Sequence, residues 1–233
     1  MDYLQVFSIL PPSVMYPDKI KLAIFDLDGT LLDTLTDLAL STNHALALNG
    51  FPEHPIESYK LFVGNGIDKL IERVLPPDSC DTETHKRVKN AFLNYYSVHL
   101  NDNTLPYPGI TELLTELKER GIQIAVATNK PQEPARAIIK EKFAAAAFIT
   151  VLGQIPERAA KPDPAIVFEI MAKAGVQASE ILYVGDSGVD MQTANNANVK
   201  AIGCKWGFRS EQELAKNGAT HLIGHPSELL NFI

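Results

Sequence analysis

Cysteine, long apolar runs and clusters of basic residues are all scarce in this sequence. The two cysteines among 233 residues, Cys80 and Cys204, flank no CxxC or His/Cys ligand spacing, which argues against a disulfide framework and a zinc site. No apolar run approaches the roughly 20 residues of a membrane helix, so we expect a soluble, cytoplasmic protein with no membrane partner. A formal net charge of -7 without a basic run makes nucleic acid a poor partner.

The first residues do not resemble a secretory signal. Met1–Tyr16 contains no lysine or arginine, and Pro11 and Pro12 interrupt its apolar stretch, unlike a secretory signal. We expect residues 1–18 to form an N-terminal extension that is flexible or docked on the surface.

Short apolar runs bounded by turn residues recur along the chain and are typical of buried strands in a parallel sheet. These runs are Leu22–Phe25, Ile122–Ala127, Phe148–Leu152, Ile181–Val184, Lys200–Cys204 and His221–Ile223. Segments with helical spacing lie between most of them. The alternation predicts an α/β fold, a doubly wound, mainly parallel sheet with a Rossmann-like core.

One stretch, residues 33–104, breaks this alternation. It shows no convincing strand, only the helix-like segments Thr36–Asn49, Ile67–Leu75 and Thr82–Leu100, and the prolines at 106 and 108 then favour an extended linker. We therefore predict a helical cap domain at 33–104, called the helical insertion below, within an α/β catalytic core of residues 19–32 and 105–233. Ligands of such sheets bind beyond the carboxyl ends of the strands, so the insertion would stand over the site.

Two acidic residues, Asp26 and Asp28, follow the first predicted strand, and Gly29 permits the chain to turn away. A simple polar turn is the alternative, but two acids so close together repel unless a cation or proton lies between them. An EF-hand loop is excluded because its glycine belongs at position six. The pair therefore indicates a metal site of another kind.

A second acidic set, Asp186 and Asp190 with Ser187 between them, follows the run Ile181–Val184. If this strand neighbours the first one, three or four carboxylates converge, and oxygen ligands of this kind suit Mg²⁺. The alternative, in which Asp186 only caps a helix beginning near residue 189, is weakened by the first acidic pair.

Polar residues also follow a third predicted strand. Thr128 and Asn129 supply a hydroxyl and an amide beside the start of the next helix, a favourable place for an anion. Lys161, fixed before Pro162, would bring a positive charge to the same edge, although an isolated exposed lysine is the commoner explanation. Each of these signals is weak when taken alone.

Taken together, these residues resemble the four motifs of the haloacid dehalogenase superfamily, in its phosphatase branch with a small helical cap. The matching residues, in chain order, are Asp26-Leu27-Asp28-Gly29-Thr30, Thr128-Asn129, Lys161 before Pro162, and Gly185-Asp186-Ser187 with Asp190. The resemblance covers the chain from about Lys21 onward. It implies that Asp26 is the nucleophile and Asp28 the general acid and base.

The resemblance also implies how the remaining groups act. The phosphoryl oxygens would be held by Thr128, Asn129 and Lys161. Mg²⁺ would be bound by the Asp26 carboxylate, the Asp28 backbone carbonyl and Asp186. Ser187 and Asp190 would support this arrangement.

Within the superfamily, the chain is most similar to the phosphoglycolate phosphatases, which implies a small phosphorylated metabolite, above all 2-phosphoglycolate, as substrate. Thr34 stands where serine is common and Asn198 where glycine is usual. In the helical insertion, Asn65 and Arg73 are candidates for substrate contact, although a simple turn between helices is the commoner meaning of the Gly64-Asn65-Gly66 stretch.

Several other functions compete with this one. A sugar-phosphate mutase resembling β-phosphoglucomutase would use the same fold, and a pyrophosphatase or a non-catalytic regulator that binds phosphorylated ligands is less favoured. A dehalogenase is disfavoured because Asp28 is the acid that an oxyanion leaving group needs. The sequence is compatible with a monomer or a homodimer.

Overall fold

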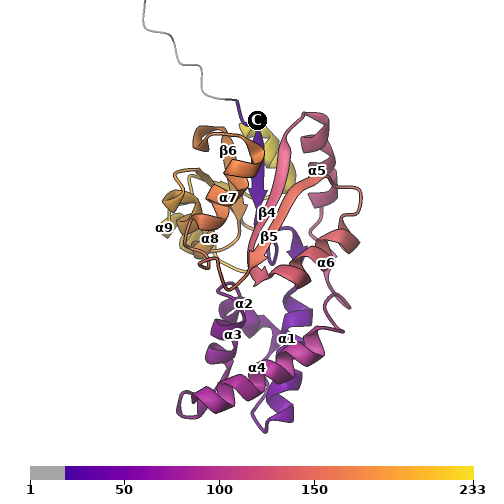
Figure 1. Ribbon diagram of the computed structural model, residues 1–233, viewed down its shortest axis with the longest axis vertical. Helices are drawn as coiled ribbons and strands as arrows, with labels where there is room; N and C mark the ends of the chain where they lie inside the picture. Colours follow the sequence, from indigo (N-terminus) through magenta and orange to yellow (C-terminus); the bar gives the residue numbers. More distant parts are fainter. Residues whose placement is uncertain (1–18) are drawn as a thin grey trace, which may run out of the picture.

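A six-stranded parallel sheet forms the centre of the chain in the computed structural model, which describes residues 19–233 (Figure 1). Its strands, in spatial order, are β5 (Phe148–Gln154), β4 (Gln123–Pro131), β1 (Leu22–Phe25), β6 (Ile181–Gly185), β7 (Lys200–Cys204) and β8 (His221–Ile223). The doubly wound α/β fold predicted from the sequence is confirmed. The predicted N-terminal extension lies outside the described residues.

The register of the three central strands decides where the polar motifs emerge. Phe25 at the end of β1 pairs with Val126 of β4 and with Val184 of β6, and all three strands run parallel. The residues that follow therefore leave the sheet at one edge. The strand order also reverses around β1, which is where α/β sheets of this kind bind their ligands.

Helices cover both faces of the sheet, so its strands are buried on both sides and read as continuous apolar runs. The helices are α5 (Ile110–Glu119), α6 (Gln132–Lys142), α7 (Ala165–Ala174), α8 (Gly188–Asn196) and α9 (Glu211–Lys216), with the 3-10 helices η3 (Ala178–Glu180) and η4 (Pro226–Phe232). Ala23 and Phe25 pack in one hydrophobic cluster with α5, α6 and η4, whereas Leu22 and Ile24 pack in another with α7, α8 and α9.

The helical insertion lies beyond the carboxyl ends of the strands (Figure 1). It contains α1 (Leu35–Leu48), η1 (Ile56–Ser58), α2 (Tyr59–Phe62), α3 (Ile67–Val74), η2 (Pro77–Ser79) and α4 (Thr82–Tyr96). These helices have their own hydrophobic cluster, whose large buried members include Leu46, Tyr59, Ile71 and Phe92. The division of the chain into two domains at residues 33 and 104 stays a prediction.

Two short strands, which the sequence analysis missed, join the insertion to the sheet. β2 (Leu32–Asp33) and β3 (Leu105–Pro106) pair antiparallel, so the chain enters and leaves the insertion at neighbouring positions. A strand of two residues is too short to show an alternating pattern. Beside this ribbon, the buried Asp37 carboxylate accepts hydrogen bonds from the backbone N–H of Asn103 at 2.9 Å and the hydroxyl of Thr104 at 2.6 Å.

Several predicted element ends differ from the structure by one or more residues, most of all those of α4 and β4. Helix α4 ends at Tyr96 instead of Leu100, and the Ser97 hydroxyl donates to the Asn94 carbonyl, a local bond that competes with helix continuation. Strand β4 continues past Ala127 to Pro131 with an irregular register. Asn198, where glycine is usual in the superfamily, has φ 58°, and asparagine tolerates this left-handed conformation better than most residues.

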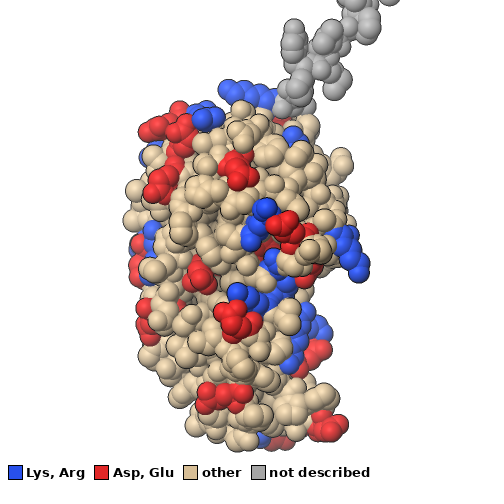
Figure 2. Space-filling model, turned by 180° about the vertical axis from the view of Figure 1, so that it is seen from behind, with Lys and Arg blue, Asp and Glu red and all other residues tan. Residues whose placement is uncertain are grey.

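Basic and acidic side chains are interspersed over the face that Figure 2 shows. Both cysteines are free, as the sequence analysis expected. Within residues 19–233, each helix is too short or too polar to cross a lipid bilayer.

Candidate active site

A pocket opens between the carboxyl edge of the sheet and the helical insertion. The sheet contributes polar side chains and the insertion contributes mainly apolar ones. The lining residues are Asp26, Asp28, Leu38, Val63, Gly64, Gly66, Ile67, Leu70, Tyr96, Thr128, Asn129, Lys130 and Pro131. The sequence motifs and the insertion therefore meet at one place.

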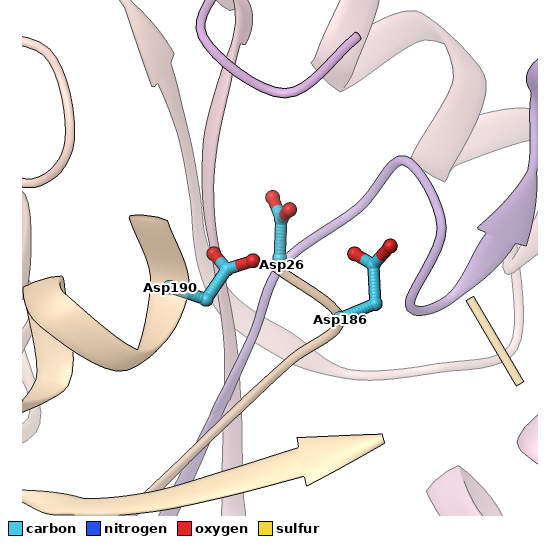
Figure 3. A group of neighbouring side chains, drawn as sticks. All are labelled: Asp26, Asp186 and Asp190. Carbon is cyan, nitrogen blue, oxygen red and sulfur yellow. The ribbon is translucent and has the colours of Figure 1, made fainter. Parts of the chain in front are cut away.

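Three buried carboxylates, one of them in the pocket lining, lie side by side (Figure 3). Asp26 follows β1, Asp186 follows β6, and Asp190 lies in the first turn of α8. One oxygen from each of the three lies within 4.8 Å of the others. Three like charges at such short range are unfavourable unless a cation or a proton compensates them.

Asp26 lies between the other two carboxylates. Lys161 Nζ forms an ion pair with Asp26 Oδ1 at 2.9 Å, and among residues 19–233 this buried oxygen has no other polar partner. Burial and the neighbouring Asp190 carboxylate raise the pKa of Asp26 to about 7, against the opposing effect of Lys161. Asp26 therefore has an oxygen available to a cation or a substrate.

Asp186 is held in one orientation by its neighbours. The Thr30 hydroxyl donates to Oδ1 at 3.1 Å, and the backbone N–H of Phe208 donates to Oδ2 at 2.8 Å. Gly29 has φ 88°, and a Cβ at this position would lie 2.3 Å from Asp186 Oδ2, so only glycine allows this approach. Burial, Asp190 and Asp26 raise the pKa of Asp186 to about 8.

Asp190 has both of its oxygens engaged. Oδ1 accepts from Lys161 Nζ at 2.7 Å and from the Tyr183 hydroxyl at 3.3 Å. Oδ2 accepts from the backbone N–H of Ser187 at 3.1 Å and from its hydroxyl at 2.5 Å, and the Ser187 hydroxyl also caps α8. Asp190 is thus better placed to orient Lys161 and the start of α8 than to bind a metal directly.

These carboxylates fit a hard divalent cation. Asp26 and Asp186 have raised pKa values, and among the described residues Asp26 Oδ1 has no polar partner other than Lys161, so a cation would relieve an existing electrostatic cost. The donor set is oxygen only, which favours Mg²⁺ over zinc or copper. Asp26 and Asp186 would hold the ion.

Lys161 is buried beside the acids, contrary to the alternative of an isolated exposed lysine. Its side chain is 2% exposed, and besides Asp190 its ammonium donates to the Ala127 carbonyl at 3.0 Å. Burial alone would lower the pKa of Lys161, but Asp190 and Asp26 raise it well above the ordinary value. The group therefore stays positively charged next to Asp26.

Thr128 and Asn129 line the same pocket as Asp26 and Asp28. The backbone N–H of Lys161 donates to Asn129 Oδ1 at 2.9 Å, so Asn129 helps to fix the loop that carries the lysine. Its amide also contacts the insertion, donating to the Gly64 carbonyl at 3.2 Å. Thr128 Oγ1 accepts from the backbone N–H of Lys130 at 3.1 Å, which leaves its hydroxyl proton free to meet an anion in the pocket.

Asp28 is paired with a lysine that the sequence analysis did not single out. Lys130 Nζ donates to Asp28 Oδ1 at 3.1 Å and to the Tyr96 hydroxyl oxygen at 2.5 Å. Burial alone would lower the pKa of Lys130, but Asp28 and Tyr96 raise it above the ordinary value. Burial raises the pKa of Tyr96 to about 12, so this hydroxyl keeps its proton.

Asn65 and Arg73 lie on the insertion but outside the pocket lining. Arg73 donates to Asn65 Oδ1 at 2.7 Å and to the Phe62 carbonyl at 2.8 Å, so the pair braces the loop between α2 and α3. Gly64 and Gly66 in this loop both have positive φ, which agrees with a turn between helices. Contact of Asn65 or Arg73 with a substrate stays a prediction.

Sequence reasoning missed several residues of the site, and only some of them left a recognisable signal in the sequence. Lys130 directly follows Thr128 and Asn129, and a lysine at the end of an apolar strand was a usable signal. Tyr96 could not be distinguished from an ordinary core residue, because it lies four residues after Phe92 on α4, on the same face of the helix. Thr30, quoted above only as part of the first motif, acts on Asp186 from a distant part of the chain, whereas Tyr183 acts on Asp190 from the preceding strand, β6.

Comparisons with known proteins agree with this geometry. The sequence profile described as Haloacid dehalogenase-like hydrolase matches residues 23–204. A phosphoglycolate phosphatase of Pseudomonas savastanoi is 34% identical over 214 residues, covering 90% of this chain and 78% of the relative. A phosphoglycolate phosphatase of Mannheimia succiniciproducens is 35% identical over 221 residues, covering 92% of this chain and 99% of the relative.

A solved structure is similar over a comparable span. The crystal structure described as a predicted phosphoglycolate phosphatase from Haemophilus somnus superposes with a TM-score of 0.84 at 31% sequence identity, covering 91% of this chain and 97% of that one. The profile match spans most of the chain and the relatives exceed 30% identity over most of their length. The chain therefore belongs to the haloacid dehalogenase-like hydrolase family.

Proposed function

We propose that the protein is a Mg²⁺-dependent phosphatase that hydrolyses a small phosphate monoester, with 2-phosphoglycolate as the preferred substrate. The observation that carries this proposal is the meeting of Asp26, Asp186 and Lys161 beside one pocket, which the Asp26 carboxylate lines. The relatives named phosphoglycolate phosphatase support the choice of substrate.

In this proposal Asp26 attacks the phosphorus atom and forms an aspartyl phosphate. A carboxylate that approaches a phosphate dianion at about 4 Å meets roughly 8 kcal/mol of repulsion at an effective dielectric constant of about 20, twice the value for two unit charges. The Lys161 ammonium, 2.9 Å from Asp26, offsets part of this repulsion and would contact the phosphoryl oxygens. Bound Mg²⁺ would supply further charge neutralisation.

Thr128 and Asn129 would hold the phosphoryl group in line with Asp26. Asp28 would protonate the oxygen of the departing alcohol. It would then accept a proton from the water that hydrolyses the aspartyl phosphate, as one group serving two half-reactions must. The apolar residues of the insertion, such as Leu38 and Leu70, would limit access of other water molecules to the intermediate.

A phosphate-release assay over small phosphate esters, with and without Mg²⁺, tests this function. We expect Mg²⁺-dependent release, highest for 2-phosphoglycolate, and its loss in Asp26→Asn, which keeps the side-chain size but removes the nucleophile. Purified, folded Asp26→Asn that released phosphate at the wild-type rate would show that Asp26 is not the nucleophile.

The same assay separates the competing functions. A mutase would return the phosphoryl group to a sugar, so free phosphate would not accumulate. A pyrophosphatase would act on pyrophosphate in preference to esters. Binding of phosphorylated ligands without turnover across the panel would indicate a regulator.

A further inference from the structure

Lys130 and Tyr96 form a polar corner of the pocket next to Asp28, and none of the roles assigned above uses it. Lys130 lies near the end of β4, and Tyr96 is the last residue of α4, so the corner joins the sheet to the insertion. The Lys130 side chain is 2% exposed, with its ammonium 3.1 Å from Asp28 Oδ1 and 4.9 Å from the centre of the Tyr96 ring. Both residues line the pocket.

This corner has more hydrogen-bond donors than acceptors. A lysine ammonium carries three N–H groups, and the side-chain acceptors of Lys130 within residues 19–233 are Asp28 Oδ1 and the Tyr96 oxygen. Tyr96 accepts from Lys130, and its own O–H has no acceptor among the described residues. Two donors, one of them on a cation, are thus available to a ligand with two acceptor oxygens.

The rest of the pocket wall offers a leaving group no other cation. On the insertion side it consists of Leu38, Val63, Ile67 and Leu70, together with the two glycines of the α2–α3 loop. Lys161 is engaged by Asp190 and Asp26 at the phosphate end. Among the lining residues, Lys130 is therefore the cation available to a negative charge on the leaving group.

The position of the corner relative to Asp28 suggests which part of a substrate it meets. In the proposed function Asp28 contacts the oxygen of the leaving group, and Lys130 is hydrogen-bonded to Asp28. A carboxylate attached to the carbon that bears this oxygen lies two bonds away from it. Lys130, which is hydrogen-bonded to Asp28, can therefore reach such a carboxylate while Asp28 contacts the leaving-group oxygen.

We propose that the Lys130 ammonium and the Tyr96 hydroxyl bind the carboxylate of the leaving group, so that the preferred substrates are phosphate esters of small 2-hydroxy carboxylic acids. This inference rests on the proposed phosphatase function and assigns its specificity to a pair of residues. An ester without the carboxylate would leave the Lys130 ammonium and the Tyr96 hydroxyl without an acceptor, away from water. Because unpaired buried polar groups cost free energy, such a site discriminates against an analogue that lacks the matching group.

Two matched esters test the proposal. In 2-phosphoglycolate and ethyl phosphate, a carboxylate in one replaces a methyl group in the other. We expect Lys130→Met to lower the ratio of their kcat/KM values by about 10- to 100-fold, the effect of losing a charge-assisted hydrogen bond. Tyr96→Phe should lower the same ratio by about 2- to 10-fold, the effect of losing a neutral hydrogen bond. Lys130→Arg keeps the positive charge, so its ratio should lie between those of Lys130→Met and the wild type.

The ratio separates binding of the carboxylate from an effect on Asp28 alone. Lys130 contacts Asp28, so Lys130→Met will slow both esters, but a purely positioning role would slow them equally and leave the ratio unchanged. That outcome would overturn the proposal. Lys69→Met is the control, because Lys69 is an exposed lysine on α3 that pairs with Glu72, and it should change neither rate.

A binding measurement covers the case in which Lys130→Met fails to fold. 3-Phosphonopropionate and propylphosphonate are non-hydrolysable analogues that again differ by a carboxylate in place of a methyl group. We expect the wild-type protein to be inhibited at least about tenfold more strongly by the carboxylate analogue, and Tyr96→Phe to reduce that preference. Equal inhibition of the wild type by both would contradict the proposal.

These results are distinguishable from failure of the proposed function. If the wild type releases no phosphate from any ester, the phosphatase function itself is wrong. If it hydrolyses phosphoglycolate but Lys130→Met and Tyr96→Phe keep the wild-type ratio, the phosphatase function stands and the carboxylate is bound elsewhere.

Discussion

The ammonium of Lys161 lies 2.7 Å from Oδ1 of Asp190, although Lys161 belongs to the loop between β5 and α7 and Asp190 to the first turn of α8. The Asp190 side chain is fully buried, and the Lys161 side chain is 2% exposed. Lys161 has Asp26 as a second counter-charge at 2.9 Å, so removing Asp190 weakens the compensation of a buried charge without abolishing it.

Asp190→Asn tests this pair. We expect it to lower the free energy of unfolding by about 1–3 kcal/mol, because Lys161 loses one of two buried counter-charges and the Ser187 hydroxyl loses an acceptor of full charge, while weaker repulsion of Asp26 offsets part of the loss. Urea unfolding measures the change. Asp68→Asn is the control, since Asp68 pairs with Lys89 on the surface and should have little effect. Equal losses in the two variants would contradict the structural role of Asp190.

Asp28→Asn should slow esters with poor leaving groups most, since these depend on protonation of the departing oxygen. We expect formation of the phosphoenzyme to fall by about 10²- to 10⁴-fold with alkyl phosphates and much less with activated aryl phosphates. Single-turnover measurements on both substrate types make the comparison. A loss of the same size on both would remove the assignment of Asp28 as general acid.

Without metal, stability should fall as the pH rises from about 4 to about 8. The pKa values of Asp26 and Asp186 are raised to about 7 and about 8 in the folded protein, from the ordinary value of 3.8. The folded state therefore binds more protons than the unfolded state over this window, and the free energy of unfolding decreases with increasing pH. Melting temperatures measured with a chelator at pH 5 and pH 8 show the trend.

Mg²⁺ should oppose this trend, because it binds the deprotonated carboxylates. We expect the melting temperature to rise more on addition of Mg²⁺ at pH 8 than at pH 5. The double variant Asp26→Asn with Asp186→Asn is the control, and its metal-free stability should depend less on pH. A variant that kept the wild-type pH dependence would show that other groups cause it.

The helical insertion should act as a lid that selects small esters. Arg209, in the loop after β7, donates to the Val63 carbonyl at 2.7 Å and so holds the insertion against the sheet. We expect wild-type kcat/KM to be much higher for phosphoglycolate than for nucleotides or phosphopeptides. Arg209→Ala should reduce this preference by about tenfold, whereas Lys205→Ala, at an exposed site in the same loop, should not. Equal wild-type efficiency on a phosphopeptide would refute the lid.

Asn65→Ala and Arg73→Ala extend this prediction to the residues first proposed for substrate contact. Because Arg73 braces the loop through the Phe62 carbonyl and Asn65, both changes should loosen the lid and lower discrimination against bulky esters. The kcat/KM ratio of phosphoglycolate to a nucleotide measures the effect. An unchanged ratio in both variants would exclude the pair from specificity.

The sequence predicted the sheet well because its signal is local. Each of the six strands is a short apolar run between turn residues, and burial on both faces makes such runs continuous. The acids could be placed at one edge because they follow strands that run in the same direction. The β2–β3 ribbon could not be predicted, since its two-residue strands are paired across the whole insertion.

The contacts that tune the site were beyond sequence reasoning because they connect distant residues. The Phe208 N–H and the Thr30 hydroxyl orient Asp186 across more than 20 and more than 150 positions respectively. Tyr96 reaches Lys130 only because α4 ends over the pocket. Nothing in the spacing of these residues distinguishes them from ordinary core positions.

The β2–β3 ribbon has a consequence for how proteins of this architecture diverge. The chain departs at Asp33 and returns at Leu105, which are paired neighbours, so the path from β1 to α5 would be nearly the same if the intervening helices were absent. Such an accessory segment can be lengthened, exchanged or lost without rerouting the sheet. Substrate preference can therefore change in one part of the gene while the groups that handle phosphate are inherited intact.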